Sequence, residues 1–112
     1  MRIAIPTANG QVCMHFGHCE VFTLIDVDPD AKAIVKQTSA APPDHQPGVL
    51  PPWLKEQGTD LVIAGGMGQR AQQIFNQHGI EVIIGAPVAA PEAVVQAYLD
   101  GNLETGENIC DH

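Results

Sequence analysis

Two thiols and two imidazoles stand close together near the start of the chain, in the segment Cys-Met-His-Phe-Gly-His-Cys, and one further pair stands at the C-terminal end. These side chains belong to Cys13, His15, His18, Cys19, Cys110 and His112. Thiolate and imidazole are the ligands that suit zinc, copper(I) and iron–sulfur species. Their density in one short loop favours metal binding.

The loop can bring three of its ligands to one point. Alternate side chains of an extended stretch face the same side, so Cys13 and His15 can converge. His18 and Cys19 are adjacent and converge only where the chain turns, which Gly17 allows. A fourth ligand from the C-terminal pair would then complete a tetrahedral site. The competing interpretation is that each cysteine is simply a small buried hydrophobe.

A second candidate site is a glycine-rich turn. Residues 66–71 match the pattern G-x-G-x-x-A between an apolar run and a helical pattern, which is the context of a dinucleotide fingerprint. However, no acidic residue ends the following apolar run, and the chain is too short for two paired nucleotide-binding halves. Two interpretations remain open. The N–H groups of the turn from Gly65 to Gly68 favour an anion, or the turn simply joins a strand to a helix.

Two other patterns are incomplete. Asp26, Asp28 and Asp30 have the spacing that opens a calcium loop, but Ala31 replaces the glycine and Gln37 the closing glutamate. A hairpin turn explains them better. A cysteine near a histidine can be an activated nucleophile, but no third catalytic member is recognisable around any cysteine.

Composition restricts the class of protein. A chain of 112 residues fits one domain, and 45% apolar residues with 4% aromatics indicate an aliphatic core. A formal charge of −8, with scattered lysines and arginines, disfavours nucleic acid. The sequence has no membrane-length apolar run and no signal peptide, so we expect a cytoplasmic protein with no membrane partner. Cysteines there are expected to be thiols or ligands rather than disulfides.

The apolar pattern predicts an α/β domain. It indicates strands at 2–6, 21–25, 33–35, 60–64 and 81–84, the last two covered on both faces, and three helices around 49–57, 71–78 and 91–99. The turn at 28–30 predicts an antiparallel hairpin, and residues 39–48 a proline-rich loop. The expected sheet is mixed and five-stranded, with parallel strands joined by right-handed crossovers. Residues 1–101 form the predicted domain, and 102–112 a flexible tail.

The chain resembles the dinitrogenase iron–molybdenum cofactor biosynthesis family in two blocks. The first is residues 1–7 followed by 15–19 and Phe22, and the second is residues 60–68 with Arg70, Ala71 and 79–82. This resemblance extends to about Asp100. It implies a ribonuclease-H-like fold without nuclease activity, in a protein that holds or carries metal–sulfur clusters. Such clusters include nitrogenase cofactor precursors and a molybdenum–copper sulfide cluster.

The resemblance also implies where the cluster pocket lies. The loop His15-Phe16-Gly17 and the turn at Gly65, Gly66, Met67 and Gly68 match the family's pocket. Cysteine content varies among members, so the resemblance speaks less directly for the cysteines. In an acidic protein, the backbone N–H groups and Arg70 would have to outweigh the repulsion of an anionic cluster.

These observations together predict a non-enzymatic carrier of an iron–sulfur, iron–molybdenum precursor or molybdenum–copper cluster. Its partners would be cluster donor and acceptor proteins, and it would be a monomer or weak homodimer. One alternative is a simple zinc or copper(I) module without inorganic sulfide. Another is a thiol redox switch that uses Cys13 and Cys19.

Overall fold

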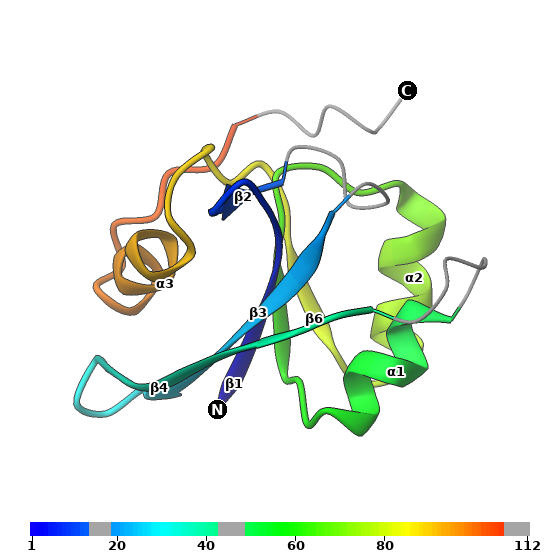
Figure 1. The fold of residues 1–112 in the computed structure, drawn as a ribbon, viewed down its shortest axis with the longest axis horizontal. Helices are drawn as coiled ribbons and strands as arrows, with labels where there is room; N and C mark the ends of the chain where they lie inside the picture. Colours follow the sequence, from blue (N-terminus) through cyan, green and yellow to red (C-terminus); the bar gives the residue numbers. More distant parts are fainter. Residues whose placement is uncertain (14–18, 43–48, 107–112) are drawn as a thin grey trace.

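The computed structural model describes residues 1–13, 19–42 and 49–106, which fold into one mixed α/β unit (Figure 1). Its elements in chain order are β1 (Arg2–Ala8), β2 (Gln11–Val12), β3 (Val21–Asp28), β4 (Ala33–Ala40), α1 (Leu50–Glu56), β5 (Leu61–Ile63), α2 (Gln69–Gln77), β6 (Glu81–Ile83) and α3 (Pro91–Leu99). The prediction of a mixed sheet with three helices is confirmed for the described residues.

The sheet has the strand order β4-β3-β1-β5-β6, and β2 pairs with the end of β1. The predicted hairpin is present as the antiparallel pair β3–β4, and β3 also runs antiparallel to β1. β1, β5 and β6 are parallel neighbours; α2 connects β5 to β6, whereas β2, β3, β4 and α1 lie between β1 and β5 in the chain. The narrower ribonuclease-H-like assignment stays a prediction.

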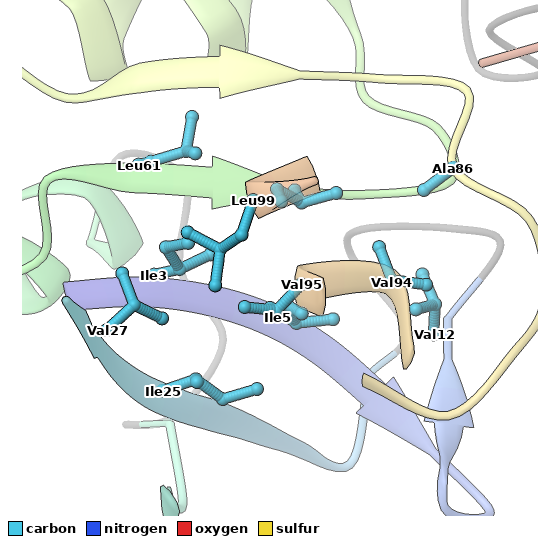
Figure 2. Packing of buried hydrophobic residues seen from close by; sticks show 11 residues of the cluster. Ile3, Ile5, Val12, Ile25, Val27, Leu61, Ala86, Val94, Val95 and Leu99 are labelled. Carbon is cyan, nitrogen blue, oxygen red and sulfur yellow. The ribbon is translucent and has the colours of Figure 1, made fainter. Parts of the chain in front are cut away.

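Helices cover both faces of the sheet: α3 lies on one face, and α1 and α2 on the other (Figure 1). Alternation along β1 divides the core accordingly, because successive side chains of a strand point to opposite faces. Ile3 and Ile5 pack with Val94, Val95 and other residues on the α3 side (Figure 2). Ala4 belongs to the cluster on the side of α1 and α2. The cluster on the α3 side is aliphatic, as the composition predicts, whereas the other cluster also contains Phe22 and Phe75.

The structure corrects three details of the predicted strands. β6 has core contacts on both faces, through Ile83 on the α3 side and Val82 on the other, but it is less buried than predicted. It is an edge strand and stays partly exposed, because no further strand pairs beyond it. β4 is longer than predicted, and its last two residues fall in the segment interpreted as a loop, because Ser39 and Ala40 pair with β3. The short strand β2 was not predicted at all.

The turn between β1 and β2 explains that strand. Asn9 and Gly10 both have positive φ values, 55° and 77°. The flanking pairs are Thr7 with Val12 and Ala8 with Gln11, so these two residues make the whole loop of a tight hairpin. Asn-Gly is the favoured sequence for a hairpin turn in which both central residues have positive φ. In the described part of the chain, no helix is long and apolar enough to cross a membrane.

Candidate functional site

The two segments singled out by the sequence meet the sheet at the same edge. β1, β5 and β6 are parallel, so their carboxyl ends lie together at the top of the sheet in Figure 1. The cysteine-bearing segment leaves this edge after β2 and returns to it at β3, and the glycine turn follows β5. In open α/β sheets, ligands bind outside the carboxyl ends of the strands. Topology therefore brings the two predicted halves of the site together.

Both ends of the cysteine-bearing loop are hydrogen-bonded to the C-terminal end of strand β1. The N–H of Cys13 donates to the carbonyl of Pro6 at 2.8 Å, and the N–H of Glu20 donates to that of Thr7 at 2.9 Å. Cys13 and Cys19 are consequently at the two ends of one loop, and both ends of that loop are attached to the end of β1. His15, Phe16, Gly17 and His18 lie outside the described residues.

The two thiols differ in burial. Cys13 is 8% exposed, and Cys19 is half-buried against the core cluster on the side of α1 and α2. Burial, and to a smaller extent the negative charge of a Cys13 thiolate, raise the pKa of the Cys19 thiol to about 11. The thiol of Cys19 is therefore neutral near pH 7 and must lose its proton before it can coordinate a metal.

Backbone hydrogen bonds fix the glycine turn. The N–H of Ala64 donates to Ile83 at 2.9 Å, and the carbonyl of Gly65 accepts from Gly85 at 3.0 Å. Gly65 and Gly66 are buried. Gly68 is the N-cap residue of α2. Because it has no side chain, it makes no capping hydrogen bond to the N–H groups of the first helical turn. This end of α2 has the chemistry to accept an anion.

Met67 and Arg70 take different positions beside this turn. Met67 is 1% exposed and belongs to the core cluster, which gives it a packing role. Its predicted contact with a bound group stays a prediction. Arg70 is exposed on the first turn of α2, where its guanidinium has access to solvent at this edge of the sheet.

The beginning of the C-terminal tail packs against the body of the protein. Leu103 contacts the core cluster on the α3 side, and the N–H of Gly106 donates to the carbonyl of Gly85 at 2.7 Å. The tail therefore contacts the loop after β6 at Gly85, and Gly85 is itself hydrogen-bonded to Gly65. Cys110 and His112 lie outside the described residues, and the predicted boundary at residue 101 stays a prediction.

Two residues that support the site were not singled out from the sequence. The side-chain Nε2 of Gln72 donates to the carbonyl of Met67 at 2.9 Å and so holds the glycine turn. Gly85 links the turn to the tail through its N–H and its carbonyl. Gly85 follows an apolar strand, as Gly65 does, and this parallel was a usable signal. Gln72 gave none, because a glutamine in a first helical turn is ordinary.

Of the six predicted metal ligands, the structure describes Cys13 and Cys19 and places both beside the end of β1. Within residues 1–13, 19–42 and 49–106, no three histidine, cysteine or acidic side chains are grouped so as to hold a metal ion. The described residues therefore supply two thiols and a glycine turn. These groups are part of the predicted set of cluster ligands.

Comparison with known proteins agrees with this arrangement. Residues 1–101 match the family model described as dinitrogenase iron-molybdenum cofactor. The chain belongs to this family. The crystal structure of PH0822 is similar to it at a TM-score of 0.85 and 30% identity, over 94% of each chain. The uncharacterized protein MJ0580 of Methanocaldococcus jannaschii is 26% identical over 110 residues, which span 96% of this chain and 92% of that protein.

A more distant member of the same fold is the orange protein of Desulfovibrio gigas, solved in its apo form. Its TM-score is 0.67 at 23% identity, covering 96% of this chain and 93% of that chain. At this identity the likeness shows a common fold. Family and fold together suggest that the role of this chain is tied to a metal–sulfur or molybdenum cofactor.

Proposed function

We propose that this protein binds and carries a metal–sulfur cluster without catalysing a reaction on it. The observation that carries the proposal is that Cys13 and Cys19 are anchored on the end of β1, at the sheet edge where the glycine turn from Gly65 to Gly68 also lies. Thiols are ligands for the soft metals of such clusters. Membership of the dinitrogenase iron-molybdenum cofactor family supports the same class of cargo.

The residues at this edge fit an anionic cluster in two ways. Cys13 and Cys19 would coordinate metal through sulfur, and the first-turn N–H groups of α2 would face sulfide or oxo edges. Arg70, exposed on the same turn, would add a positive charge in a protein whose formal net charge is −8. These local donors would oppose the unfavourable field of the remaining acidic residues. His15, His18, Cys110 and His112 stay candidate ligands for the same cargo.

The predicted partners follow from carriage. A carrier receives its cargo from one protein and delivers it to another, so cluster donor and acceptor proteins are the proposed partners. Iron–sulfur, iron–molybdenum precursor and molybdenum–copper clusters are all compatible with thiol and N–H donors. A cytoplasmic monomer or weak homodimer is the proposed form.

The thiol redox switch is the weaker alternative. Redox-sensor cysteines have lowered pKa values and good solvent access. Cys19 has a raised pKa, about 11, and Cys13 is 8% exposed, which are the opposite properties. A zinc or copper(I) module without sulfide uses the same thiols and is separated from the cluster carrier by analysis of the bound inorganic atoms.

The test is to purify the protein without oxygen from its own host and to measure metals, acid-labile sulfide and the visible spectrum. We expect iron, or molybdenum with copper, together with sulfide and charge-transfer bands. Zinc or copper without sulfide would establish the simple module instead. Protein reconstituted with ferrous iron and sulfide, or with copper(I) and tetrathiomolybdate, then identifies which cargo is retained through gel filtration.

The double variant Cys13→Ser/Cys19→Ser tests the site. We expect it to lose bound metal and sulfide while unfolding cooperatively like the unaltered protein. Glu81→Gln, at the start of β6 and so at the opposite end of that strand from the site, is the control variant and should keep its cargo. Retention of metal and sulfide by the double variant would contradict ligation by these cysteines.

A further inference from the structure

A polar pocket of about 340 Å³ opens on the α3 side of the sheet, away from the thiol of Cys19. It lies between the ends of β1 and β4, the start of β3 and the start of α3, and its lining includes Thr7, Asn9, Glu20, Thr23, Gln37 and Glu92. Thr7 and Thr23 are each two residues away from an isoleucine that faces α3, Ile5 on β1 and Ile25 on β3. Side chains two residues apart on a strand point to the same face, so the two hydroxyls lie on the α3 side of the sheet. Neither the core nor the proposed cluster site accounts for this pocket.

The hydroxyls at its floor are arranged as acceptors. Thr7 and Thr23 are 5% and 4% exposed, and their oxygens are 2.8 Å apart. The hydroxyl of Thr7 donates its one proton to the carbonyl of Ile5 at 2.9 Å. Thr23 must therefore donate to Thr7, because each hydroxyl has one proton. The lone pairs of the Thr23 oxygen then remain as acceptors at the pocket floor.

The rim adds more acceptors. Glu20 accepts from the N–H of Asn9 at 2.7 Å through one carboxylate oxygen, and Glu92 accepts from Nε2 of Gln37 at 3.4 Å through one of its own. Each carboxylate has further lone pairs, and Gln37 keeps its carbonyl oxygen. Among the described residues that line the pocket there is no lysine, arginine or histidine. Asn9 and Ser39 of the lining can also donate hydrogen bonds, but no described lining residue carries a positive charge to balance the two carboxylates.

The N-terminus of α3 does not make the pocket favourable to anions. Helix N-termini favour anions, but Pro91 at the start of α3 has no N–H to offer. Glu92 in the first turn places a carboxylate there and offsets the positive end of the helix dipole.

We propose that this pocket binds an alkylammonium group, as found in a lysine side chain or a free diamine. Such a group has three N–H donors and one positive charge, which match two carboxylates and the Thr23 oxygen. A metal ion fits less well, since the described residues include no cluster of three acidic, histidine or cysteine ligands. The volume also exceeds that of one ion or water molecule, the latter being about 30 Å³ in the liquid.

The test is an NMR titration of metal-free protein with n-butylammonium chloride, compared with equal concentrations of sodium chloride. We expect saturable shifts of the amides of Thr7, Asn9 and Thr23 that sodium chloride does not produce. Glu20→Gln and Glu92→Gln should each weaken binding about two- to fivefold, as removal of an exposed ion pair does. Thr23→Val should weaken it similarly, because it removes the acceptor at the pocket floor.

Glu81→Gln is the matched control, because it removes the same charge on β6, at the opposite edge of the sheet. An equal loss of affinity in this variant would reduce the effect to general surface charge and overturn the proposal. If calcium chloride shifts the same amides and binds with higher affinity than butylammonium, the proposal would be overturned in favour of a metal site. Glu20→Gln and Glu92→Gln alter exposed residues, so the test does not depend on the stability of Thr23→Val.

The same titration separates the two sources of the group. Tighter binding of acetyl-Gly-Lys-Gly-amide than of butylammonium supports a lysine from a partner protein, and tighter binding of cadaverine supports a free diamine. No metal or sulfide is present, so the outcome is independent of the proposed cluster carriage.

Discussion

Gly85 and Gly106 are in backbone contact: the N–H of Gly106 donates to the carbonyl of Gly85 at 2.7 Å. Gly85 has a φ of 81°, and a Cβ placed on it would overlap the backbone carbonyl of Gly106. The N–H of Gly85 in turn donates to Gly65. A glycine is therefore required at residue 85 both by its own conformation and by the close approach of the tail to the glycine turn.

Gly85→Ala should destabilise the protein and detach the tail. Gly101→Ala is the control, because Gly101 has a similar φ of 75° but nothing within 4 Å of a built Cβ. Both variants incur the cost of a left-handed conformation, about 1–2 kcal/mol, so the larger effect of Gly85→Ala measures the contact. Urea unfolding and amide exchange of Gly106 provide the readouts. Equal free energies of unfolding in the two variants would show that the contact contributes nothing.

Gln72→Ala should loosen the glycine turn. It removes the hydrogen bond from Nε2 to the carbonyl of Met67 and should lower the free energy of unfolding by about 1 kcal/mol. If the turn binds cargo, affinity for the cluster should fall as well, because its N–H groups lose their fixed direction. Gln73→Ala changes the adjacent, exposed residue of the same helix and should leave both quantities unchanged. Alanine is the better helix former, so helix propensity cannot cause a loss. A drop of similar size in both variants would therefore show that the loss does not come from the hydrogen bond to Met67.

The thiol of Cys19 should react slowly at neutral pH. Its pKa is about 11, mainly because of burial, so in metal-free protein the rate of alkylation by iodoacetamide should rise about tenfold per pH unit from pH 7 to 10. Mass spectrometry of the modified peptide distinguishes Cys19 from the other cysteines. A plateau below pH 9 would show a thiol of ordinary or lowered pKa.

The raised pKa also sets the direction of two pH dependences. The folded state holds the Cys19 proton more tightly than the unfolded state, so this group's contribution to stability is present below about pH 9 and is lost as pH rises toward 11. Metal binding displaces the same proton, so apparent metal affinity should increase with pH. Calorimetric titrations in buffers of different ionisation enthalpy count the released protons.

Arg2 and Asp26 join the N-terminal strand to β3. Nε of Arg2 donates to one carboxylate oxygen of Asp26 at 2.7 Å and Nη2 to the other at 3.1 Å, while Nη1 donates to the carbonyl of Gln57. This hydrogen-bonded guanidinium lowers the pKa of Asp26 below its usual value. The two side chains are about one-third exposed, so solvent weakens the pair.

Asp26→Asn should therefore lower the free energy of unfolding at pH 7 by about 0.5–1 kcal/mol. The pKa of Asp26 is depressed in the folded state, so its stabilisation is present above about pH 4 and is lost as pH falls through the folded-state value. The difference between variant and unaltered protein should shrink accordingly in acid. Urea unfolding at pH 7 and pH 3 measures it, and Glu81→Gln serves as a charge control. A difference that stays constant with pH would contradict an ionic origin.

Local patterns predicted most of the fold. Alternating and continuous apolar runs indicated β1, β3 and β5, and the aspartates at 28 and 30 indicated the hairpin turn. β2 was predictable too, because Asn9-Gly10 is a strong hairpin signal, but two residues are too few to show a period. The partial exposure of β6 was not predictable, since whether an apolar strand is central or at an edge depends on its neighbours.

The sequence by itself determined the chemistry available to this protein: two thiols bracketing a histidine-rich loop, and a glycine turn that opens a helix. Only the tertiary structure decided that the ends of that loop and the glycine turn share one sheet edge, that Gly85 ties the turn to the tail, and that hydroxyls and carboxylates from four elements line one pocket. The physical reason is that residue type and local spacing set propensity and ligand chemistry, whereas strand order sets which distant segments meet.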